Sequence, residues 1–202
     1  SMRTCDPLSI QPCLQRFDRI QSSALESIIG AALTSQAAEQ ASLPVSKGGL
    51  GLRKASSHCF AAFLSSTAQT SKIVDSILQN FPYRRSVQEA LDDFLATAGP
   101  IPQDTKDDLK TLDPVHFTQS KLSHLIDSNL QAKLLSGAAR VSDNRSMARL
   151  KSLTLAHASD YLNSIPSHTS GLSLLPQSFR FALLYRLGLP IYATPVPRCP
   201  AC

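Results

Sequence analysis

The stretch LPVSKGGLGLR, residues 43–53, decides how the first part of this chain folds, because it separates two apolar runs with helical spacing. It places three glycines within four positions, at Gly48, Gly49 and Gly51. Glycine permits backbone conformations and close approaches that other residues do not, at a cost in conformational entropy. The stretch therefore predicts a turn in which the backbone itself is the important feature.

This turn has two open interpretations. In the first, its backbone and the flanking Lys47, Arg53 and Lys54 lie against a nucleic-acid strand. In the second, it is a tight interhelical turn whose leucines fill the core. It is not a P-loop, because its glycines, lysine and hydroxyl stand in the wrong order and no strand precedes them.

Apolar residues at three- and four-residue spacing predict helices throughout, and no segment alternates as a strand would. The expected helices cover 14–41, 55–66, 71–80, 86–98, 105–111, a segment opened by Asp113-Pro114 that ends near Gly137, 143–163 and 176–187. The predicted fold class is all-α, an irregular bundle of about seven or eight helices with an extended proline-rich C-terminal tail. The Gly99–Pro102 segment is expected to divide residues 1–98 from residues 99–198.

Basic residues gather toward the end of the 202-residue chain, which has a net charge of +5. Residues 140–202 carry seven Lys or Arg and only two Asp or Glu. This surplus favours a polyanion such as RNA or DNA as a partner. A solvated helical face is the alternative explanation.

The sequence has no apolar run long enough to span a bilayer and opens with no signal peptide. We therefore expect no membrane partner, an intracellular location in the nucleus or cytoplasm, and reduced thiols. Ser1-Met2 has the look of a remnant of tag removal, so the natural amino terminus is expected elsewhere.

Five cysteines are present, without the density of a disulfide framework. Cys59 stands among apolar residues and is interpreted as a small buried hydrophobe. Cys199 and Cys202 have the spacing of a zinc half-site, and the five histidines show no ligand spacing. We expect no cofactor in this chain by itself, and zinc at Cys199 and Cys202 in a full-length protein.

The sequence offers only weak candidates for a catalytic arrangement. Asp92 and Asp93 are adjacent, so on a helix they point in different directions. His157, Ser159 and Asp160 lie along one helical segment, whereas the members of a triad converge across a fold. The sequence therefore predicts a protein that is not an enzyme by itself.

A helical run from Leu14, the LP and GGLGLR sequences within residues 43–53, and AAFL at residues 61–64 follow one another in this order. Together they resemble the region just after the polymerase palm in non-LTR retrotransposon reverse transcriptases. Further matches to the family's downstream segment are HASDYLNSIP at 157–166, Gly171-Leu172, Phe179-Arg180 and RLGLP at 186–190. Tryptophan is common in the family where this chain has Tyr161, and residues 67–140 carry little of its pattern.

The resemblance implies a non-catalytic module, because the palm's aromatic-x-Asp-Asp motif and an endonuclease constellation are both missing. Residues 1–98 would be thumb-like, residues 99–198 linker-like, and residues 199–202 the start of a Cys/His zinc cluster. In that family such regions help hold template–primer duplex or target DNA near the palm. The implied partners are RNA or DNA and the rest of a parent polyprotein.

Seven basic residues are the implied nucleic-acid contacts. Lys47, Arg53 and Lys54 would face the strand. A second basic surface would consist of Arg145, Arg149, Lys151 and Arg180. The alternative function is a helical protein-interaction or structural domain, such as one domesticated by a host, whose apolar groove receives a partner helix.

Overall fold

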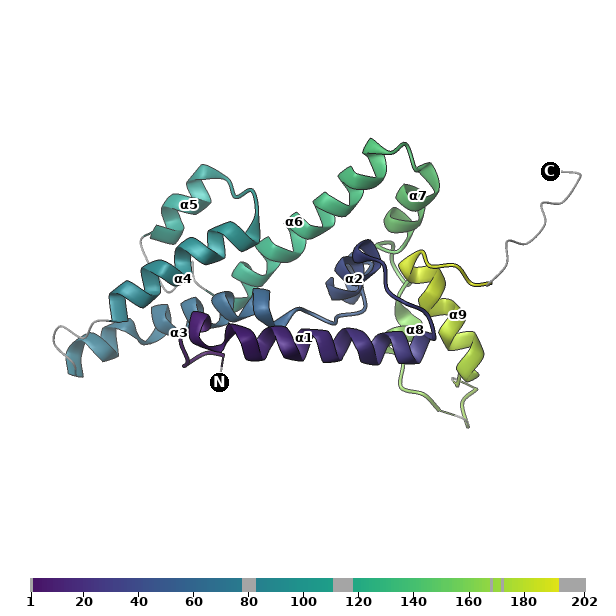
Figure 1. The fold of residues 1–202 in the computed structure, drawn as a ribbon, viewed down its shortest axis with the longest axis horizontal. Helices are drawn as coiled ribbons and strands as arrows, with labels where there is room; N and C mark the ends of the chain where they lie inside the picture. Colours follow the sequence, from purple (N-terminus) through teal and green to yellow (C-terminus); the bar gives the residue numbers. More distant parts are fainter. Residues whose placement is uncertain (1, 78–82, 111–117, 168, 172, 193–202) are drawn as a thin grey trace, which may run out of the picture. The chain divides into compact units, whose positions relative to one another are not determined.

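The computed structural model describes residues 2–77, 83–110, 118–167, 169–171 and 173–192. Over these residues the fold is all-α, as predicted (Figure 1). The helices are α1 (Pro7–Ile29), α2 (Ser35–Ser42), the 3₁₀ helix η1 (Val45–Lys47), α3 (Ala55–Ile77), α4 (Tyr83–Ala98), α5 (Gln103–Lys110), α6 (Gln119–Arg140), α7 (Asn144–Ser152), α8 (Asp160–Asn163) and α9 (Pro176–Leu187). The proline-rich tail expected after residue 192 lies outside the described residues.

The chain forms two compact units, each assembled from separated segments. The first contains Ser1–Gln21 and Arg53–Leu134, and the second contains Ser22–Leu52 and Leu135–Cys202. The Gly99–Pro102 segment, expected to divide the chain, falls inside the first unit.

Local contacts explain why the chain does not divide at Gly99–Pro102. Asn129 Nδ2 on α6 donates hydrogen bonds to the carbonyl oxygens of Ala98 at 2.6 Å and Pro100 at 3.0 Å. Ile101 is buried in the core of the first unit. A proline-glycine segment that is bonded and buried in this way is a corner of one unit rather than a linker.

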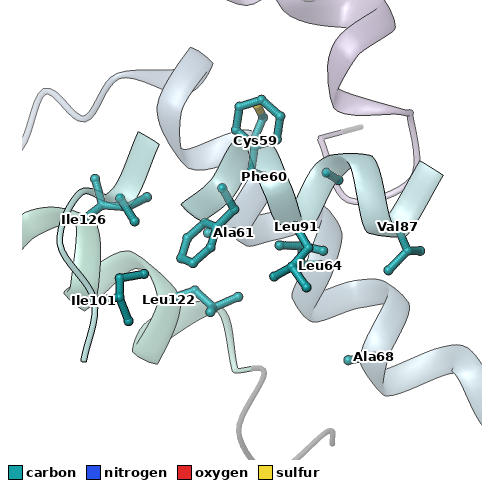
Figure 2. Close-up of a cluster of buried hydrophobic side chains, with 13 residues drawn as sticks. Cys59, Phe60, Ala61, Leu64, Ala68, Val87, Leu91, Ile101, Leu122 and Ile126 are labelled. Atoms are coloured by element: carbon teal, nitrogen blue, oxygen red, sulfur yellow. The ribbon is translucent and has the colours of Figure 1, made fainter. Parts of the chain in front are cut away.

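The core of the first unit joins α3 and α4 to the first half of α6 (Figure 2). Small residues of α3, such as Ala61 and Ala68, are fully buried and allow close approach of the neighbouring helix. The buried members are Cys59, Phe60, Ala61, Leu64, Ala68, Val87, Ala90, Leu91, Phe94, Ala98, Ile101, Leu122 and Ile126. Cys59 is therefore a buried apolar residue, as interpreted, and burial raises the pKa of its thiol to about 11.

Asp18 on α1 fixes the start of α3. Its carboxylate accepts hydrogen bonds from the backbone N–H of Ala55 at 2.7 Å and of Ser56 at 3.1 Å. The first N–H groups of a helix have no intrahelical acceptor, and a carboxylate there also complements the helix dipole. A side chain distant in sequence thus caps α3 and ties α1 to it.

The core of the second unit is formed by the end of α1, by α2 and by α9. Its buried residues are Leu25, Ile29, Ala37, Ala41, Leu183, Leu184, Leu187 and Leu189. Pro176 opens α9 and Gly188, with φ +70°, ends it, as the sequence predicts. Leu50 and Leu52 of the glycine turn also pack against this cluster.

The single helix expected over 14–41 is wrong, because α1 ends at Ile29 and α2 begins at Ser35. Gly30 adopts φ +62°, a left-handed conformation that ends a helix at little cost for glycine. Thr34 then caps α2 by accepting from the N–H of Ala37 at 3.1 Å. The glycine and the cap outweigh the continuous apolar pattern.

The long helix expected over 143–163 is also wrong. Asp143 caps α7 as a helix start, but α7 ends at Ser152 and only α8 follows before residue 164. Ser152 and Thr154 donate their hydroxyls to the preceding carbonyls of Arg149 and Lys151, at 2.8 Å each. Short hydroxyl side chains compete with helix hydrogen bonds in this way.

Around residues 66–80 the sequence predicted two helices, whereas α3 runs without a break from Ala55 to Ile77. The expected start at Asp113-Pro114 lies outside the described residues. Across the described ranges, every helix is too short or too polar to cross a lipid bilayer.

Candidate nucleic-acid interface

The glycine turn of the second unit is held from inside by a buried arginine. Arg186 on α9 is fully buried, on the same side of the helix as the core residues Leu183 and Leu187. Its Nε donates to the carbonyl oxygen of Gly49 at 2.9 Å, and its Nη2 donates to that of Val45 at 2.8 Å. Nη2 also donates to Ser159 Oγ at 2.9 Å. The guanidinium therefore supplies donors to two carbonyls of the glycine turn, in addition to the Gly48 N–H that the Val45 carbonyl already accepts at 3.1 Å.

A buried glutamine and a second arginine complete this arrangement, which we call the Arg186 node (Gln40, Arg149, Ser159 and Arg186). Gln40 Nε2 donates to the carbonyl oxygens of Gly48 at 3.0 Å and Arg186 at 2.7 Å. Gln40 Oε1 accepts from Arg149 Nη1 at 3.0 Å, and the same Nη1 donates to the Arg186 carbonyl. That carbonyl lies in the last turn of α9, where acceptors lack intrahelical donors and cations are favoured.

Gly49 leaves no room for a side chain. A Cβ placed there would overlap the Leu43 carbonyl and lie 2.6 Å from the carbonyl oxygen of Gln40. Gly48 and Gly49 are both buried. This is the geometry of a tight interhelical turn whose backbone faces protein at Gly48 and Gly49, and Gly51 is its exposed glycine.

The predicted contact residues of the second unit differ in their surroundings. Arg145 and Lys151 are exposed on α7, and Lys47 is half-buried at the end of η1. Arg149 belongs to the Arg186 node, and burial lowers the pKa of its guanidinium. Arg180 donates to the carbonyls of Ile29, the last residue of α1, and of Gly30, which follows it. Arg149 and Arg180 thus have structural partners.

In the first unit, Arg53 forms an ion pair with a buried carboxylate, and Lys54 is exposed. Arg53 Nη2 lies 2.7 Å from Asp127 Oδ2, with the arginine side chain 47 % exposed and the aspartate 3 % exposed. The structure therefore gives Arg53 a role in neutralising Asp127. Its remaining exposed surface is available to solvent.

Asp127 also takes part in an arrangement that includes a serine and a histidine. His58 Nδ1 lies 3.2 Å from Ser123 Oγ, and His58 Nε2 lies 3.6 Å from Asp127 Oδ1. The pKa of His58 is lowered, mainly because burial penalises the imidazolium and despite the nearby Asp127. A hydrolytic triad needs an accessible nucleophile. Ser123 is buried, so this cluster stabilises the packing of α3 on α6 rather than forming a nucleophilic site.

Sequence reasoning missed the Arg186 node. The available signal was a charged residue at a core position: Arg186 falls between Leu183 and Leu187 on the buried face of α9. Gln40 likewise lies next to buried Ala41 on α2. Buried polar side chains of this kind need hydrogen-bond partners, and turn carbonyls are the nearest supply.

The predicted zinc ligands, Cys199 and Cys202, lie outside the described residues. Within the part of the chain that the structure describes, no group of three or more His, Cys, Asp and Glu side chains could hold a metal ion. The zinc half-site remains a prediction.

Comparison with known proteins gave no match: no family model fits the chain, and neither the curated proteins nor the solved structures include a similar one.

Proposed function

We propose that this chain is a non-catalytic helical module that binds RNA or DNA through the phosphate backbone, as part of a retroelement reverse transcriptase. The observation that carries the proposal is a run of exposed cations from the end of α6 through α7. We call Arg140, Arg145 and Lys151 the basic segment; all three are exposed. Exposed Lys and Arg supply the electrostatic term that dominates nucleic-acid affinity.

Asp143, the acidic residue within the basic segment, reduces the positive potential of that segment only slightly. Asp143 is engaged as the cap of α7, accepting from the N–H of Ser146 at 3.0 Å. Hydrogen bonds from Ser146 also lower the pKa of Asp143, so the carboxylate stays ionised and engaged in the cap. A capping carboxylate is partly neutralised by the positive end of its own helix.

The order of sequence matches with non-LTR reverse transcriptases adds support from the sequence. It makes template RNA or target DNA the proposed ligand, with the rest of a polyprotein as a further partner and an intracellular location. The buried glycine turn changes one detail of the expectation. Phosphate contacts are assigned to the basic segment rather than to the turn backbone.

The test is a titration of a labelled RNA–DNA duplex at several salt concentrations. Each neutralised phosphate releases counterions, so three contacts give a slope of log K against log salt of roughly −3. A steep loss of affinity with salt supports the proposal. Absence of binding at the lowest salt would overturn it for this module.

A second candidate function is a protein-interaction module. It is favoured by Phe17 and Ile20, two large apolar side chains three residues apart on α1 that are both exposed. Exposed apolar residues on one helix face are typical of a surface that receives a partner. Absence of duplex binding would leave this function as the better explanation.

A further inference from the structure

One face of α9 exposes aromatic rings. Phe181 and Tyr185, one helical turn apart, are 42 % and 58 % exposed. Tyr192 follows the helix with 63 % exposure, and its ring centre lies 6.5 Å from that of Phe181. Soluble proteins seldom leave neighbouring aromatic rings open to water, so this face, which we call the aromatic face, needs an explanation.

The remainder of the same helix face consists of small, uncharged residues. Ser178 and Gly188 continue the spacing of Phe181 and Tyr185, and both are exposed. The opposite face of α9 holds core residues such as Leu183 and Leu187. The rings are therefore not a poorly packed part of the core.

A guanidinium group borders the aromatic face. A Cβ built on Gly188 would lie 2.6 Å from Arg149 Nη2, so Arg149 reaches the exposed end of α9. The Arg186 node fixes its position through Gln40. Residues 176–192 contain no Asp or Glu, and Arg180 on α9 is exposed, so the charge carried by this segment at the surface is positive.

We propose that the aromatic face stacks the bases of single-stranded RNA or DNA. This inference rests on the proposed function and specifies the form of nucleic acid at this site. Surfaces that bind single strands combine aromatic rings, on which successive bases stack, with cations that attract the backbone. Paired bases are already stacked inside a duplex, so exposed rings select unpaired nucleotides. The surrounding charge complements a polyanion rather than an apolar helix.

The chain provides its own optical probe, because it has four Tyr and no Trp. Tyr185 and Tyr192 are two of those four, so stacking of bases on them quenches a large share of the tyrosine emission. A 20-nucleotide oligo(dT) strand and an RNA–DNA duplex of equal length are titrated separately at low salt. Binding is followed by tyrosine emission and by the anisotropy of a label on the nucleic acid.

The informative variant replaces Phe181 and Tyr185 together by Leu. This change keeps apolar surface but removes the flat rings. We expect oligo(dT) affinity to fall roughly tenfold or more, the quenching to shrink, and duplex affinity to stay unchanged. The matched control is Phe17→Leu, an equally exposed ring on α1, which is expected to alter none of these readings. Both altered side chains are exposed, and a far-UV spectrum checks that the helices remain.

Three outcomes overturn the inference in different ways. If the duplex binds but oligo(dT) does not quench the tyrosine emission, the base-stacking inference is rejected and the proposed function is unaffected. Retention of oligo(dT) affinity by the double Leu variant assigns the face to an apolar protein partner instead. Absence of any binding at low salt removes the proposed function, and the stacking inference with it.

Discussion

Arg186 donates from Nε to the carbonyl oxygen of Gly49 at 2.9 Å, joining residues 137 positions apart in the sequence. The arginine is the largest fully buried side chain of the described residues. Its charge is met by backbone carbonyls and a hydroxyl rather than by a carboxylate. These hydrogen bonds therefore couple the glycine turn to α9 within the second unit.

Replacement of Arg186 by Met is expected to destabilise the protein by about 3 kcal/mol. The apolar side chain fits the space in length but leaves the carbonyl of buried Gly49 without its Arg186 donor and removes one of the donors to the Val45 carbonyl. The matched control is Arg180→Met, because Arg180 also donates to carbonyls but is exposed, so water can replace it at a cost of about 1 kcal/mol. Urea unfolding followed by circular dichroism measures both. Equal losses for the two variants would contradict the central role of Arg186.

The space around Gly49 and Gly137 predicts that alanine changes stability in opposite directions at these two glycines. Gly49→Ala is expected to cost about 3 kcal/mol, because the new methyl meets the Leu43 backbone, which cannot rotate away. Gly137→Ala on α6 meets nothing within 4 Å and is expected to stabilise by roughly 0.5–1 kcal/mol through helix propensity. Thermal unfolding of the two variants checks the signs. A neutral Gly49→Ala would show that the turn backbone can shift.

The helices were largely predictable from local pattern, whereas their interruptions and the two units were not. Pro176 and Gly188 bound α9 because a proline start and a glycine stop act locally. The apolar spacing continues across Gly30, so it does not predict the end of α1 there. It also gives no sign of the hydroxyls near Ser152 that compete with the helix hydrogen bonds. The composition of the units depends on contacts such as Asp18 with Ala55, which residue spacing does not contain.

The candidate site was predictable in charge but not in geometry. The surplus of cations near Arg145 and Lys151 is visible in the sequence, and both side chains are exposed. The sequence does not distinguish them from Arg149 and Arg180, whose guanidinium groups bind carbonyls. A basic side chain can donate to a phosphate or to the carbonyls at a helix end with the same chemistry. Which of the two it binds depends on its position in the tertiary structure.

His58 gives a prediction for pH. Its folded-state pKa is lowered below the ordinary 6.5, mainly by burial, so near that pH the unfolded chain binds more protons than the native one. The free energy of unfolding therefore rises with pH through the window just below 6.5 and falls on acidification there. Urea unfolding across this window should show that the free energy of unfolding depends less steeply on pH in His58→Gln than in the wild type. The control, His157→Gln, changes a histidine whose side chain is 87 % exposed. If both variants keep the wild-type slope, the burial of neutral His58 is not the cause.

The basic segment predicts how nucleic-acid affinity responds to the loss of single charges. Arg145→Ala and Lys151→Ala are each expected to weaken duplex binding at low salt about equally for every base sequence. Each should also reduce the slope of log K against log salt by about 1, because one phosphate contact is lost. Neither side chain is buried, so the stability of the protein should stay within about 0.5 kcal/mol of the wild type.

The control for this prediction is Lys72→Ala, which removes one exposed positive charge from α3 in the first unit. It lowers the net charge by the same amount as either variant of the basic segment. If affinity depended on net charge alone, all three variants would lose the same affinity and the same salt slope. A smaller effect of Lys72→Ala locates the phosphate contacts on α7, because direct contacts release bound counterions whereas distant charges are screened. Equal effects would remove the basic segment from the binding surface.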